Sequence, residues 1–149
     1  MICSSAESLA RTISYLILGS AFCFALTACR SIDPALKPES ILPGSSWRLV
    51  ALDGLPVAGR SLPNIQFDKQ NVVGDTGCNR YSAPASLSGN SITIGAVSMS
   101  KRACEEPIQS RESRYIDQLA RAYRLEVSPR FLAIYCDDAD SPLRFARDN

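Results

Sequence analysis

The sequence predicts an α+β domain: mostly antiparallel strands in a curved, barrel-like sheet, with one covering helix. Short apolar runs alternate with turn residues, which is typical of antiparallel strands. One later stretch instead has the apolar spacing of a helix. Residues 29–149 provide enough chain for one domain with its own core.

The predicted strands begin with residues 46–52, which end at Asp53-Gly54. Asp68-Lys69-Gln70 and Gly89-Asn90 are turn sequences between apolar runs, and each predicts a hairpin. The other predicted strands are residues 64–67, 71–74, 85–88, 91–94, 96–99, 124–127, 131–136 and 143–146. Trp47 lies in the first strand, and its large apolar ring predicts burial in the core.

The helix is predicted from Pro107 to about Ala122. Apolar residues fall on one face from Tyr115 to Tyr123, and charged residues occupy the opposite face. Pro107 suits the first helical turn. Glu105-Glu106 precede it, where negative charge complements the positive end of the helix dipole.

Residues 1–28 are predicted to be a cleaved signal peptide. The apolar run of 14 residues from Ile13 to Leu26 is shorter than the roughly 20 residues that a spanning helix needs. It ends in Leu26-Thr27-Ala28-Cys29, which resembles the lipobox of bacterial lipoproteins. The resemblance implies cleavage before Cys29 and lipid attachment at Cys29. Attachment of two or more acyl chains would anchor the protein stably to a membrane.

Residues 29–45 are predicted to be the lipidated cysteine and a flexible tether, with the domain covering residues 46–149. Prolines and a glycine without an apolar period are typical of a linker. Arg30, rather than aspartate, follows the cysteine, and the sorting rule of such lipoproteins then implies the outer membrane. We expect the domain to face the periplasm.

The composition excludes several classes of function. The chain contains no histidine, which excludes Ser-His-Asp and Cys-His catalysis and any zinc site that uses histidine. A net charge of +1 argues against a nucleic-acid partner. We therefore predict no catalytic residues, no metal and no cofactor, and we expect a protein that is not an enzyme.

Several short motifs occur along the chain in the order in which they occur in a known protein family. Gly77-Cys78-Asn79-Arg80-Tyr81 resembles the GCNxY/F signature of the META domain, the HslJ-like heat-shock lipoprotein family. Residues 100–104 resemble its T-x-M-A-C motif, and Glu112 to Tyr115 resembles its E-x-x-F/Y helix motif. The opening Trp47-Arg48-Leu49 and the closing strands at residues 131–135 and 143–145 also match.

The resemblance implies the same barrel-like fold and a non-enzymatic envelope lipoprotein. It further implies a link to heat shock or to antibiotic resistance, with an unknown protein or small-molecule partner. The chain departs from the pattern at Ala83, Ser100 and Arg102, where Gly, Thr and Met are common. An alternative function is a periplasmic inhibitor of a hydrolase such as lysozyme or a protease, which would insert an exposed loop into the target's cleft.

The family motifs also imply a disulfide, because Cys78 and Cys104 both lie within them. Cys136 would then be a spare buried thiol. Two alternatives stay open from the residues alone: a pairing that involves Cys136, or three buried free thiols. Asn79 is expected to form a turn at a strand end, and contact with a ligand is the alternative. Residues 137–140 (DDAD) are expected to be a solvated loop, since they lack the glycine and distal glutamate of a calcium loop.

Overall fold

The computed structural model describes residues 37–148. The predicted signal peptide and Cys29 therefore lie outside the described residues. The described chain runs through α1 (Pro38–Ile41), β1 (Ser46–Leu52), β2 (Leu55–Pro56), β3 (Asn64–Asp68), β4 (Asn71–Asp75), β5 (Arg80–Ser88), β6 (Ser91–Ile94), β7 (Ser98–Met99), α2 (Ile108–Ala120), β8 (Ala122–Val127), β9 (Phe131–Cys136) and β10 (Leu143–Arg147).

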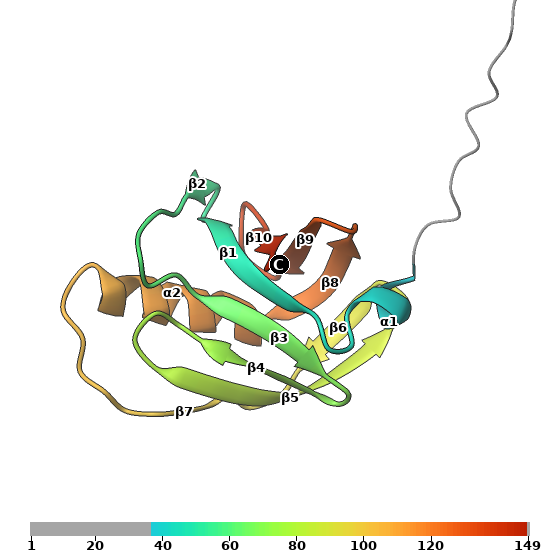
Figure 1. The fold of residues 1–149 in the computed structure, drawn as a ribbon, viewed down its shortest axis with the longest axis horizontal. Helices are drawn as coiled ribbons and strands as arrows, with labels where there is room; N and C mark the ends of the chain where they lie inside the picture. Colours follow the sequence, from blue (N-terminus) through green and yellow to red (C-terminus); the bar gives the residue numbers. More distant parts are fainter. Residues whose placement is uncertain (1–36, 149) are drawn as a thin grey trace, which may run out of the picture. The chain divides into compact units, whose positions relative to one another are not determined.

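The strands form a closed antiparallel barrel of 8 strands, which confirms the predicted fold class (Figure 1). The order around the barrel is β1, β3, β4, β5, β6, β8, β9 and β10, and β10 pairs back with β1. Trp47 lies opposite Arg147 in the closing pair, and Leu49 lies opposite Phe145. Closure pairs the two strands that would otherwise be open sheet edges. The short strands β2 and β7 pair with β1 and β5.

Alternating apolar residues from the strands fill the barrel. Trp47 is fully buried, as predicted. Its indole Nε1 donates a hydrogen bond of 2.6 Å to Ser45 Oγ, so burial leaves no unpaired donor there. The other fully buried strand residues include Leu49, Ile65, Val72, Leu125, Ile134, Leu143 and Phe145.

Helix α2 lies across the end of the barrel where β1 finishes and β5 starts. Tyr115 and Leu119 on its apolar face are fully buried. Near its last turn, Gln118 Nε2 donates to Asp53, which follows β1, and Arg114 pairs with the same carboxylate at 2.8 Å. Figure 1 shows α1 at the opposite end of the domain. Within residues 37–148, no helix has the length and apolar character needed to cross a membrane.

The domain begins before residue 46, so the prediction of a flexible tether over residues 29–45 is wrong for its last part. Leu42 is fully buried in the core, and the Gly44 N–H donates to the Phe67 carbonyl at 2.8 Å. Pro38 occupies the start of α1, and Gly44 adopts a φ of 74°. Pro38 and Gly44 therefore belong to a helix start and a turn. Such segments have a composition similar to that of a linker.

Strand β5 is longer than predicted, because it begins at Arg80 rather than at Ala85. The strand contains Pro84, which has no N–H to donate to the ladder. The sheet continues around this position: the Pro84 carbonyl accepts from the Gly95 N–H, and the Ala85 N–H donates to the Gln70 carbonyl, both at 2.8 Å. The predicted strand over residues 96–99 shrinks to β7, and β2 was not predicted.

Candidate functional site

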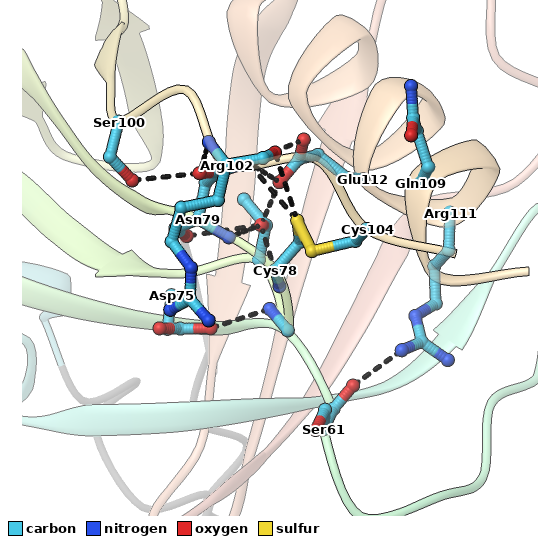
Figure 2. The surroundings of a disulfide bond; sticks show 12 residues. Ser61, Asp75, Cys78, Asn79, Ser100, Arg102, Cys104, Gln109, Arg111 and Glu112 are labelled. Carbon is cyan, nitrogen blue, oxygen red and sulfur yellow. Dashed lines mark hydrogen bonds between the residues drawn. A yellow bond between two sulfur atoms is a disulfide. The ribbon is translucent and has the colours of Figure 1, made fainter. Parts of the chain in front are cut away.

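Three of the motifs identified in the sequence meet where α2 crosses the barrel end (Figure 2). Asn79 lies at their centre and is only 2% exposed. Its Oδ1 accepts from the Arg102 N–H at 2.7 Å and from Ser100 Oγ at 2.9 Å. Its Nδ2 donates to the Arg102 carbonyl at 3.2 Å and to the Glu112 carboxylate at 3.1 Å. Asn79 therefore joins the barrel, the loop before α2 and α2 itself. The sequence predicted only a turn at this position, and the role of Asn79 in the structure is larger.

Glu112 brings a carboxylate into this buried network. The residue is only 7% exposed, and none of the ion pairs in residues 37–148 involves it. Besides Asn79, the hydroxyl of Thr76 donates to it. The Thr76 oxygen in turn accepts the Asn79 N–H at 2.9 Å. A buried carboxylate is costly unless it is hydrogen-bonded, so these neutral donors are what make Glu112 acceptable here.

A second contact between strand and helix runs beside the first. The hydroxyls of Tyr81 and Tyr115 lie 2.7 Å apart, and their rings meet edge to face with centroids 5.9 Å apart. Tyr81 also donates to the Asn64 carbonyl at 2.9 Å. Burial raises the pKa of both tyrosines well above the usual value. Glu112 and Tyr115 are three apart on α2 and share one face of the helix, so this face contacts both Asn79 and Tyr81.

The glycine and cysteine of the same motif have separate steric and covalent roles. Gly77 has a φ of 90°, and a Cβ at this position would lie 2.4 Å from the Ser61 carbonyl oxygen. Cys78 forms a disulfide with Cys104, the pair that the family motifs implied, with Cα atoms 6.0 Å apart. Linking residues 26 apart stabilises the fold by about 3 kcal/mol in the chain-entropy model.

Cys136 remains a free thiol within the described residues and is buried near the end of β9. Burial raises the pKa of this thiol to about 11. The thiolate form, which is the reactive one, is therefore scarce at neutral pH. Cys136 is therefore the spare buried thiol that we expected from the sequence.

A polar cleft of about 680 Å³ opens beside the disulfide. Its walls come from the loop between β2 and β3, the link between β4 and β5, the outer side of β1 and the loop before α2. The lining residues are Arg48, Gly59, Arg60, Ser61, Leu62, Asn64, Asp75, Gly77, Cys78, Arg102 and Cys104. Three arginines and one aspartate thus line the cleft, which is cationic.

Sequence reasoning missed both the buried network and the cleft. One signal could have revealed the network: Glu112 lies three residues before Tyr115, so it falls on the apolar face of α2, where an acid needs a partner. The cleft had no such signal. Arg48 and Arg60 lie on different elements, and neither belongs to a motif in which charge was expected.

The two acidic segments lie elsewhere. Glu106 Oε2 accepts the Ser110 N–H at 3.3 Å in the first turn of α2, which agrees with the predicted interaction at the helix start. Residues 137–140 lie between β9 and β10, and the exposed Asp138 is 3.8 Å from Arg121. No group of three or more His, Cys, Asp or Glu side chains in residues 37–148 is arranged to hold a metal ion.

A protein-family model described as the META domain matches residues 40–149. The chain belongs to the META domain family. The match begins inside α1, in agreement with the early start of the folded domain. It also covers Gly77 to Tyr81, Cys104 and Glu112, so the network around Asn79 lies within the META domain. No curated protein matches the sequence.

Solved structures share the fold. A protein from Burkholderia xenovorans, determined by NMR, has a TM-score of 0.63 at 23% identity, covering 75% of this chain and 87% of its own. A second NMR structure has a TM-score of 0.59 at 20% identity, covering 73% and 92%. A DUF4847 family protein from Bacteroides vulgatus has a TM-score of 0.55 at 14% identity, covering 74% and 96%. At these identities the likeness concerns the fold alone.

Proposed function

We propose that this META protein is a non-enzymatic lipoprotein of the bacterial outer membrane that acts by binding, with its domain in the periplasm. Its biological role would be in the envelope's response to stress, either heat or antibiotics. The observation that carries the non-enzymatic part is the arrangement of the motif. The amide of Asn79 and the carboxylate of Glu112 are bonded to each other and to their neighbours, so they brace the helix instead of presenting a base to the cleft.

The positions of the two ends of the domain support a tethered binding protein. The described chain starts beside α1, at the end of the domain opposite α2 (Figure 1), whereas the polar cleft is lined by Arg102 and Cys104 from the loop before α2. An anchor at Cys29 would join the domain through residue 37, where the described chain begins. The near-neutral charge of the chain supports a partner other than nucleic acid.

The test combines lipid labelling with complementation. Cells expressing the wild-type chain or Cys29→Ser are grown with a radiolabelled fatty acid, and their membranes are fractionated. We expect label in the wild-type outer membrane and none in the variant. A strain that lacks the protein should grow poorly under heat or with novobiocin, and the wild-type chain should restore growth better than Cys29→Ser. Equal labelling of both forms would rule out the anchor.

The alternative, a periplasmic inhibitor of a hydrolase, makes a different prediction. An inhibitor should be retained on a column of immobilised lysozyme or protease and should reduce the enzyme's activity in proportion to its concentration. A binding lipoprotein of the proposed kind should pass through such columns. The two functions are therefore separated by one pull-down with purified protein.

A further inference from the structure

The polar cleft beside the disulfide has more positive charge than its surroundings neutralise. Arg48 pairs with Asp148 at 2.5 Å. By contrast, Arg60 and Arg102 form no ion pair with any residue from 37 to 148, although both line the cleft. Asp75 is the one carboxylate in the lining, and its Oδ1 already accepts the Gly77 N–H at 2.7 Å.

The walls of the cleft are held rigidly. The Gly77 backbone lies so close to the Ser61 carbonyl that no side chain fits between them. Arg111 of α2 donates to the same carbonyl at 2.5 Å, and Figure 2 shows it reaching from the helix to the loop that carries Ser61. The disulfide fixes the opposite wall. A preformed site of this kind binds with less loss of conformational entropy than a mobile one.

The position of Arg102 is fixed by the network described above. Asn79 holds both the N–H and the carbonyl of Arg102, whereas no hydrogen bond or ion pair of its guanidinium is seen within the described chain. Figure 2 shows this side chain extending toward Asp75, and both residues line the cleft. The backbone is thus rigid, and the guanidinium is free to receive a ligand.

We propose that this cleft binds an anionic group with several oxygens, of the phosphate type, between Arg60 and Arg102. A guanidinium presents parallel N–H donors that match the oxygens of such groups. The lining is mainly polar, which favours a hydrated, oxygen-rich ligand over an apolar one. The inference rests on the proposed function, because it supplies the ligand chemistry for a protein that acts by binding.

Phosphate could reach the cleft as a free anion or as a lipid headgroup, and two experimental arms separate these sources. In the first, the ¹⁵N-labelled full-length protein in neutral detergent is titrated with pyrophosphate, and sodium chloride of matched ionic strength serves as the reference. We expect saturable amide shifts at Ser61, Gly77 and Arg102. In the second, the protein is sedimented with vesicles of phosphatidylglycerol or of phosphatidylcholine.

Matched variants make the result specific to the cleft. Arg60→Gln and Arg102→Gln remove one guanidinium each, and neither side chain makes a hydrogen bond or ion pair within residues 37–148 that folding would lose. Each should weaken binding by at least about tenfold. Arg130→Gln is the control, because Arg130 is an exposed residue in the turn between β8 and β9 and does not line the cleft. Its binding should equal that of the wild type.

Saturable shifts with pyrophosphate would identify a free anion as the ligand source, and selective sedimentation with phosphatidylglycerol would identify a headgroup. Either result supports the proposal if the two cleft variants reduce it. No saturable binding in either arm, or binding that Arg60→Gln and Arg102→Gln leave unchanged, would overturn it. Failure here would leave the lipid anchor untouched, because fatty-acid labelling of Cys29 measures that separately.

Discussion

Replacing Asn79 should destabilise the domain more than any other change to a side chain of comparable size, because its amide uses all of its donors and acceptors. In Asn79→Ala, the buried carboxylate of Glu112 and the part-buried backbone groups of Arg102 lose partners. Each unsatisfied buried group costs about 1–3 kcal/mol. With some relief from water that enters the gap, we expect a total loss of about 3–5 kcal/mol in the free energy of unfolding.

Swapping the amide and the carboxylate between positions 79 and 112 provides a stricter test. Asn79→Asp replaces the donor with a second carboxylate against Glu112, and should cost more than Asn79→Ala. Glu112→Gln supplies an amide donor, so the double variant Asn79→Asp/Glu112→Gln restores one hydrogen bond in the reverse direction. We expect a favourable coupling energy of about 1–3 kcal/mol between the two substitutions.

Urea unfolding followed by tryptophan fluorescence measures the wild type and all four variants, and Asn71→Ala is the control. Asn71 is an exposed residue of β4, so its loss should change stability by less than about 0.5 kcal/mol. If Asn79→Ala costs no more than this control, the network does not brace the helix. Additive effects of the two substitutions would show that residues 79 and 112 do not interact.

Three further predictions concern buried groups. Trp47→Ala should cost about 3–5 kcal/mol, since the ring is fully buried; water-like fluorescence emission from the native wild-type protein would contradict this burial. Because burial raises the pKa of Cys136 to about 11, the native protein should react slowly with iodoacetamide at pH 8 and rapidly once unfolded, with Cys136→Ala as the blank. In an absorbance titration of the native protein, Tyr81 and Tyr115 should stay protonated at the pH where tyrosines of the unfolded chain ionise. Their raised pKa favours folding at low pH, so stability should fall above the unfolded pKa of about 10. Ionisation of Tyr81 and Tyr115 in the native protein near pH 10, before unfolding, would refute this last prediction.

The sequence predicted the elements with simple periods and missed those that depend on tertiary contacts. Strand β1 and the hairpin of β3 and β4 follow from alternating residues and turn signals. The first half of β5 was not predicted, and it contains Pro84, around which the hydrogen bonds that continue the ladder are not visible in a sequence pattern. The start of the domain was misplaced for a related reason: a linker and a short capping segment share prolines and glycines, and only the burial of Leu42 distinguishes them.

The candidate site divides in the same way. The motif around Asn79 could be recognised by resemblance, yet its role required the position of Glu112 on the helix and of the Arg102 backbone in the loop. The cleft could not be predicted, because it depends on Arg60 and Arg102 being brought together by elements far apart in the chain. Charge balance over the whole chain hides such a local excess, since a net charge of +1 sums over all surfaces.

The buried network and the cleft are physically connected through one loop. Asn79 fixes the backbone at Arg102, and the disulfide fixes Cys104 two residues later. The loop is therefore held on both sides of Ala103, while the Arg102 side chain is left available to the cleft. Variants of Asn79 that still fold should then weaken anion binding without touching the ligand, because Arg102 loses its fixed position. In this arrangement, the motif that stabilises the barrel end also prepares the surface beside it for binding.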